Sequence, residues 1–137
     1  MSDHARLAPS SAHRWVKCGM SRLMAEQYPQ QGDMGTGPAE EGTAAHWVAE
    51  MVLHGKPVCE GVTAPNGVIV TDEMIDGANL YADVIGTLDK NCHTESRVTM
   101  AQTIHPENWG TPDFWRFRDG VLSVVDYKFG FGYVDAF

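Results

Sequence analysis

One stretch of the sequence determines how the chain folds: Asp113-Phe-Trp-Arg-Phe-Arg-Asp-Gly-Val-Leu-Ser-Val-Val-Asp-Tyr-Lys128. Two runs rich in aromatic and β-branched residues flank Asp119-Gly120, a dipeptide that is the strongest short-range signal for a tight β-hairpin. A two-residue turn at this dipeptide fixes the register of both strands and places Asp113 opposite Asp126. Directly opposed residues hold their Cβ atoms about 4.5–5.5 Å apart. The sequence therefore predicts two neighbouring carboxylates at the open end of a hairpin.

Side chains alternate between the two faces of a strand, so Asp113, Asp126 and Lys128 share one face of this hairpin. Like charges that lie opposite each other destabilise a sheet unless a cation lies between them, and hard divalent cations prefer carboxylate oxygens. A metal site is favoured over the alternative, a pair of solvent-facing acids at a strand end, by the apolar residues expected on the same face. These are Trp115, Phe117, Leu122 and Val124.

The composition limits the classes of protein to be considered. A chain of 137 residues with 43% hydrophobic content is long enough for one domain, over 1–137, with a core of its own. Its 10 basic and 18 acidic residues give a net charge of −8, which argues against a broad basic surface for nucleic acid. A metal-dependent nuclease stays open, because bound cations and a few local Lys or Arg residues can supply the phosphate contacts. No apolar run approaches the ~20 residues of a membrane span, so no membrane partner is expected.

The cysteines and the N-terminus bear on location. Cys18, Cys59 and Cys92 are odd in number and widely spaced, and they form neither a disulfide framework nor a CxxC metal pattern. The N-terminal residues lack the apolar segment of a signal peptide. A reducing, intracellular location is the expectation.

An α+β fold follows from the order of the expected elements, with a three-stranded antiparallel sheet flanked by helices. The helix expected over about 71–90 has Thr71 as its N-cap and acidic residues in its first turn. A Gly- and Pro-rich stretch over 29–38 predicts a flexible loop. The helices are expected over about 11–18, 40–54 and 71–90, and the strands over about 94–104, 111–118 and 121–128.

His46 lies at the edge of the apolar stripe of the second expected helix. A lone histidine in such a place is more often a hydrogen-bonded boundary residue than a metal ligand. The helix pattern alone therefore does not make His46 a ligand.

Four stretches in order resemble the PD-(D/E)XK nuclease superfamily, in its RecB-like exonuclease branch from phages and prophages. They are Leu7–Cys18, Glu41–His46, Gly110–Asp113 and Val125–Lys128, and the resemblance covers about residues 6–134. It implies a partial restriction-endonuclease-like fold. Members of the superfamily continue past the D-x-K strand into a helix with a Gln and a Tyr, whereas this chain stops at Phe137. The expectation is thus the N-terminal part of the family fold, either as a fragment or as a version shortened at the C-terminus, and the resemblance places it in the cytoplasm of a bacterial host cell.

The resemblance also implies roles for single residues and a cofactor, Mg²⁺ or Mn²⁺. A histidine ligand would favour Mn²⁺. Some relatives hold an iron–sulfur cluster through one N-terminal and three C-terminal cysteines. Cys18 lies near the place of the N-terminal cysteine, but the three C-terminal cysteines are missing from this sequence, so no cluster is expected. The implied metal ligands are His46, Asp113, Asp126 and the backbone carbonyl of Tyr127; Lys128 would orient or activate the attacking water, and Glu41 would be a helix-borne acid near the site.

Two functions are expected from these residues. The first is a metal-dependent DNA nuclease, most simply an exonuclease, that hydrolyses phosphodiester bonds in phage recombination or DNA processing. The alternative is a catalytically inert, shortened module of the same fold that binds or inhibits a host protein. A homo-oligomer is a further expectation, because a small sheet with an open edge strand tends to pair with another chain.

Overall fold

The computed structural model describes residues 5–28 and 37–130, which group into two compact units. The first unit comprises Met1–Asp33 and Lys90–Asp126, and the second comprises Met34–Asp89 and Tyr127–Phe137. Each unit is described by itself. Within the described residues, no helix is long and apolar enough to cross a membrane.

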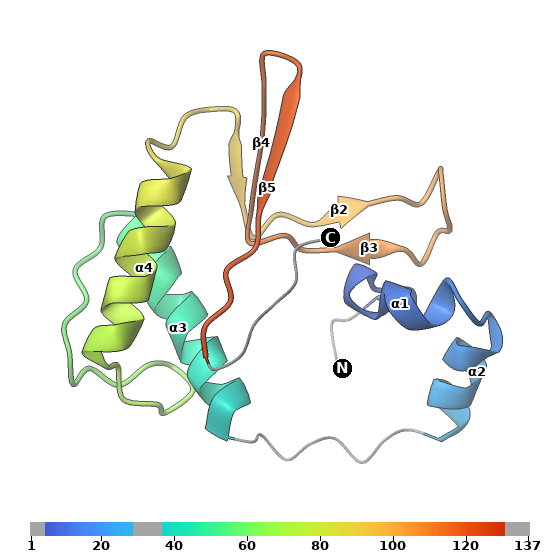
Figure 1. Ribbon diagram of the computed structural model, residues 1–137, viewed down its shortest axis with the longest axis horizontal. Coiled ribbons are helices and arrows are strands. Elements are labelled where there is room, and N and C mark those ends of the chain that lie inside the picture. Colours follow the sequence, from blue (N-terminus) through green and yellow to red (C-terminus); the bar gives the residue numbers. More distant parts are fainter. Residues whose placement is uncertain (1–4, 29–36, 131–137) are drawn as a thin grey trace. The chain divides into compact units, whose positions relative to one another are not determined.

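Two long helices, α3 (Gly37–Leu53) and α4 (Asp72–Ile85), lie side by side and build the second unit (Figure 1). The Thr71 side chain accepts a hydrogen bond from the Met74 amide and caps α4, which ends before Gly86 at φ 72°. The apolar stripes of both helices are buried, as the helical spacing predicts. The buried positions are Ala44, Ala45, Val48 and Ala49 on α3 and Met74, Ala78, Tyr81 and Ile85 on α4.

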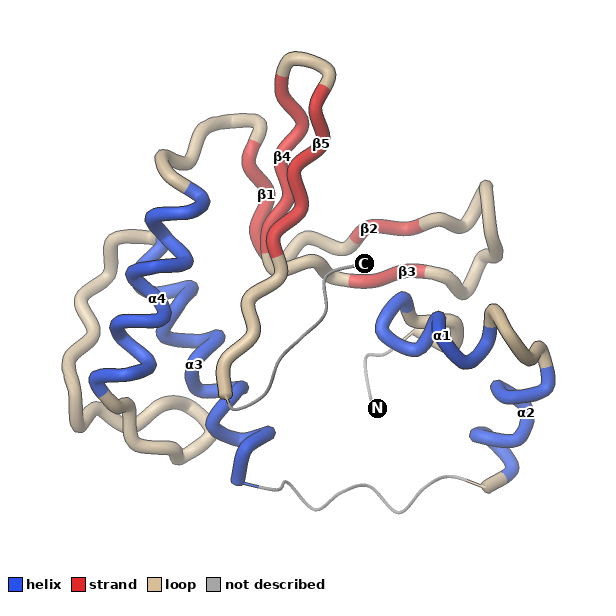
Figure 2. Tube along the Cα trace, viewed as in Figure 1, coloured by secondary structure: helices blue, strands red, loops and turns tan. Residues whose placement is uncertain are grey.

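The connection between α3 and α4 has little regular structure (Figure 2). One isolated antiparallel bridge joins Thr63 to Ile69, and Ala64 and Val70 are buried. The Asn66 side-chain amide donates to the Glu40 carbonyl at 2.8 Å, so this loop is fastened to the first turn of α3.

A three-stranded antiparallel sheet forms the centre of the first unit, in the order β1 (Cys92–Thr94), β4 (Phe114–Arg118) and β5 (Val121–Val125). Phe114 pairs with Val125, which confirms the predicted register of the hairpin. The turn residues Asp119 and Gly120 both have positive φ, 51° and 79°, as a type I′ turn requires. The α+β class and the three-stranded antiparallel sheet are confirmed.

The rest of the first unit is a second small sheet and the N-terminal helices. β2 (Val98–Thr99) pairs with β3 (Trp109–Gly110). Asn108 is buried, and its side chain donates to the Leu7 carbonyl at 2.7 Å, so the turn before β3 holds the N-terminal segment. The helices are the 3₁₀ turn η1 (Pro9–Ser11), α1 (Ala12–Trp15) and α2 (Met20–Gln27).

The single strand predicted over 94–104 is wrong. Glu95 has a φ of 47°, which breaks the extended backbone directly after β1, and the chain then pairs as β2 in a different sheet. The predicted helix over 71–90 ends at Ile85, because Gly86 takes a positive φ. The helix expected over 11–18 is a 3₁₀ turn followed by the short α1, and the helix expected from 40 begins at Gly37. The loop predicted over 29–38 lies outside the described residues up to 36.

The apolar hairpin face is open to solvent near the turn. Phe117, Leu122 and Val124 are 56%, 59% and 58% exposed, whereas Phe114, on the opposite face, is 1% exposed. Phe117 and Leu122 form a pair beyond the end of β1, which pairs with β4 only as far as Arg116, and Val124 lies on the edge strand β5. The tip of the hairpin therefore extends beyond the third strand.

Candidate metal centre

Three acidic residues adjoin the last paired row of the three-stranded sheet. The last paired row joins Thr94 of β1 to Phe114 of β4 and Phe114 to Val125 of β5. One residue further along each strand come Glu95, Asp113 and Asp126, which we call the acid row. The Glu95 amide donates to the Asp113 carbonyl at 3.2 Å, so the pairing of β1 with β4 continues into this row.

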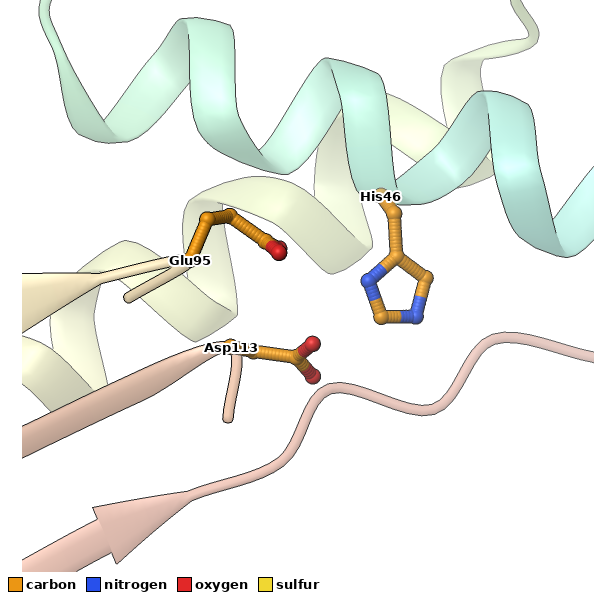
Figure 3. A group of neighbouring side chains, drawn as sticks. All are labelled: His46, Glu95 and Asp113. Carbon is orange, nitrogen blue, oxygen red and sulfur yellow. The ribbon is translucent and has the colours of Figure 1, made fainter. Parts of the chain in front are cut away.

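Glu95 and Asp113 bring their carboxylates close together (Figure 3). One oxygen of each lies within 4.8 Å of the other, with Glu95 exposed and Asp113 half-buried. Two carboxylates this close repel unless a cation or a proton lies between them. Carboxylate oxygens converging from neighbouring strands are the donors that Mg²⁺ and Mn²⁺ prefer, so these residues fit a divalent metal ion.

Sequence reasoning missed Glu95. The strand predicted over 94–104 placed Glu95 near its start, whereas in the structure β1 ends at Thr94 and Glu95 follows it directly. Its positive φ was a further obstacle, because glutamate rarely adopts this conformation. Glu95 reaches this position through the pairing of β1 with β4. That pairing joins segments far apart in the sequence, so no turn motif indicates it.

The predicted ligand His46 belongs to the second unit and lies on α3 (Figure 3). Its imidazole is half-buried and meets the Tyr127 ring edge-on, at 5.3 Å between centroids and 69° between planes. Tyr127 in turn packs against Tyr81 of α4 at 5.1 Å. Burial raises the pKa of the Tyr127 phenol. Within the described part of the first unit, Glu95 and Asp113 are thus candidates for holding a metal ion, and the role of His46 of the second unit stays a prediction.

The sequence was also compared with known protein families. A family described as "Protein of unknown function (DUF2800)" matches residues 4–136. The chain belongs to the DUF2800 family. No solved structure matches this DUF2800 chain. Because the description of DUF2800 names no activity, the function has to be argued from the chemistry of the acid row and of the residues around it.

The remaining predicted site residues of this DUF2800 protein lie as follows. Asp126 is exposed and ends the acid row. Lys128 is exposed and follows Tyr127, whose side chain is buried. Glu41 is exposed near the start of α3, and it lies about 140° from His46 around the helix axis. Within α3, Glu41 and His46 therefore point in different directions.

Proposed function

We propose that this DUF2800 protein is a divalent-metal-dependent nuclease that hydrolyses phosphodiester bonds in DNA, with a site of the PD-(D/E)XK type. The observation that carries the proposal is the acid row, in which three neighbouring strands end in Glu95, Asp113 and Asp126. A bound Mg²⁺ or Mn²⁺ supplies a nucleophilic water and neutralises the charge that develops on the phosphate. The order of motifs that resembles this superfamily supports the same assignment.

His46 is the proposed nitrogen ligand of the site. Its ring lies against Tyr127, and Tyr127 is joined by a peptide bond to Asp126 of the acid row. An imidazole ligand shifts the preference of such a site from Mg²⁺ toward Mn²⁺. The Tyr127 carbonyl would be a further oxygen donor.

Lys128 is the proposed cation for the substrate. It is exposed and is two residues from Asp126 along the chain. Its ammonium would donate hydrogen bonds to the attacking water or to a phosphate oxygen. Glu41 stays a candidate for an acid that supports the site. It is a weaker candidate than His46, because the two residues point in different directions on α3.

The charge of the chain is divided unequally between the units. The first unit carries eight Lys and Arg against eight Asp and Glu, whereas the second carries two against ten. The whole net charge of −8 therefore belongs to the second unit. A metal ion bound at the acid row would make the first unit net positive. This supports DNA contact through the first unit, despite the acidity of the chain as a whole.

A second candidate function is a binding module without catalysis. Exposed apolar side chains on the hairpin tip and on α2 favour it, because contiguous apolar surface marks interaction sites. They include Phe117, Leu122, Val124, Met20 and Met24. A host protein or a second copy of the chain would be the partner, and the open edge of β5 suits either.

DNA cleavage tests the nuclease proposal. Linear and circular DNA are incubated with Mn²⁺ or Mg²⁺ and the wild-type protein, Asp126→Asn or Asp119→Asn. Asp119 is the matched control, because it is an acid of the same hairpin, 90% exposed, with a positive φ that asparagine tolerates. We expect wild type and Asp119→Asn to cleave alike and Asp126→Asn to lose about a hundredfold or more in rate.

Digestion of linear DNA alone would mark an exonuclease. A folded wild-type protein that leaves both forms of DNA intact would overturn the proposal and leave the binding module. Equal cleavage by wild type and Asp126→Asn would overturn the assignment of the acid row.

A further inference from the structure

Gly77 lies in the interior of α4 at a place where a side chain does not fit. A Cβ atom at this position would meet the Tyr127 Oη at 2.6 Å, closer than real Cβ contacts. The next atoms are the Tyr127 Cζ and the Phe129 Cδ2, both at 3.7 Å, an ordinary van der Waals distance. Glycine in a helix interior is ordinarily less stable than alanine. At Gly77 it makes room for the phenol oxygen of Tyr127. We call this space beside Gly77 the notch.

Tyr127 connects this notch to His46 within the second unit. Its side chain is 8% exposed, and its ring packs at 45° against Tyr81 of α4 and edge-on against His46 of α3. A ring held by the notch on one side and by two aromatic neighbours has little freedom to shift. Any displacement of Tyr127 therefore reaches the imidazole of His46 directly.

Lys128 lies between the two aromatic residues that reach Gly77. Tyr127 and Phe129 both approach the notch, while Lys128 is exposed. The packing of these two neighbours against the notch restricts the backbone that carries Lys128.

We propose that the notch at Gly77 is a positioning element for the metal centre: it seats Tyr127, and through Tyr127 it sets the place of His46 and the direction of Lys128. The effect on metal binding rests on the proposed function. Gly77 and the Tyr127 side chain touch neither metal nor substrate, and they act through the residues they hold.

A double-mutant cycle with Gly77→Ala and Tyr127→Phe tests the proposal, with melting temperature and Mn²⁺ affinity as readouts. In the wild-type background, Gly77→Ala should lower the melting temperature and weaken Mn²⁺ binding about tenfold, the effect typical of residues that orient metal ligands. In the Tyr127→Phe background the phenol oxygen is absent, so alanine fits. There, Gly77→Ala should raise the melting temperature through helix propensity and leave Mn²⁺ affinity unchanged.

Gly42→Ala is the matched control. Gly42 lies in the interior of α3, and a Cβ there has no atom within 4 Å. This substitution should raise the melting temperature in both backgrounds and leave Mn²⁺ affinity as it was. A loss of affinity in Gly42→Ala would show that the readout follows any change in the helices, and would overturn the specific role of Gly77.

The outcomes separate this proposal from the nuclease proposal. If wild type binds Mn²⁺ and Gly77→Ala binds it equally well, the notch is only a packing feature and the positioning proposal is overturned with the metal centre intact. If wild type binds no Mn²⁺, the proposed function itself fails. Should Gly77→Ala not fold, Tyr127→Leu replaces it: this variant keeps Gly77 and loses the ring against His46. Tyr127→Leu should bind Mn²⁺ about tenfold more weakly, and unchanged affinity would overturn the proposal.

Discussion

The two units of this protein differ in how they bury their apolar residues. In the second unit, α3 and α4 bury an unbroken stripe each, and Val48 and Met74 are 0% and 2% exposed. In the described part of the first unit, Phe114 is the large apolar side chain that is fully buried, while α2 and the hairpin tip expose theirs. Many buried residues therefore contribute to the core of the helical unit, whereas the described part of the sheet unit depends on few buried residues.

The same contrast separates stability from chemistry. The acid row lies on the sheet unit, whose short strands end in charged residues. His46 and the Gly77 notch lie on the helical unit, where packing fixes side-chain positions. The acids proposed to bind the metal are therefore drawn from the less buried sheet unit, whereas the proposed nitrogen ligand lies on a packed helix.

The largest effect is expected at Phe114. Phe114→Ala should cost about 3–5 kcal/mol of local stability, because it removes the one large buried side chain in the described part of the sheet unit. Hydrogen exchange should show β4 and β5 losing protection while α3 and α4 keep theirs. Phe117→Ala, on the same strand but 56% exposed, is the control and should change little. Equal losses in both units would contradict the division described here.

A smaller effect is expected at the start of α4. The Thr71 hydroxyl accepts from the Met74 amide at 3.4 Å, a long capping bond. Thr71→Ala should therefore lower the free energy of unfolding by about 0.5–1 kcal/mol, the lower part of the range for N-caps. Urea denaturation followed by circular dichroism measures it.

Thr43→Ala is the control for this substitution. Thr43 lies within α3, and its hydroxyl donates back to the Ala39 carbonyl at 3.0 Å. Such a bond contributes little to a helix, so this variant should match or exceed wild type in stability. A larger loss from Thr43→Ala than from Thr71→Ala would contradict the capping role.

Much of this could be predicted from the sequence, and the limits are physical. The hairpin register was predictable because Asp119-Gly120 sets it locally, and Phe114 pairs with Val125 as expected. The start of α4 followed from Thr71 in the same way. The place of Glu95 could not be predicted, because the pairing of β1 with β4 joins segments that no turn connects. The exposure of Phe117 depends on the length of β1, which propensity does not determine. The roles of His46, Asp126 and Lys128 stay predictions.

The smallest effect is expected when the pH is lowered and the ion pairs of Arg6 are lost. Arg6 forms ion pairs at 2.7 Å with Glu26 of α2 and with Glu107 before β3, and these hydrogen bonds hold the pKa of both carboxyl groups below the ordinary value of 4.5. Above that value both carboxylates are charged whether the chain is folded or not, and the pairs contribute fully. As the pH falls from 4.5 through the lowered folded pKa values, the unfolded chain takes up protons first and this contribution is lost.

The loss should be slight, because the groups are exposed and solvent screens them. The protection of the Leu7 amide, which donates to the Glu107 carbonyl, relative to its intrinsic exchange rate at each pH should fall as the solution is acidified below pH 4.5. In Arg6→Ala this protection should be lower already at neutral pH and should respond less to acid. The same acid response in wild type and Arg6→Ala would show that these pairs do not hold the segment.

The most direct test of the central claim is a calorimetric titration of the protein with Mn²⁺, comparing wild type with Asp113→Asn. Asp113 lies in the middle of the acid row, between Glu95 and Asp126, and Asp119→Asn again serves as the control. The account predicts saturable binding in wild type and in Asp119→Asn, and loss of that binding in Asp113→Asn. Equal binding by all three proteins, or no binding by folded wild type, would contradict a metal centre at the acid row.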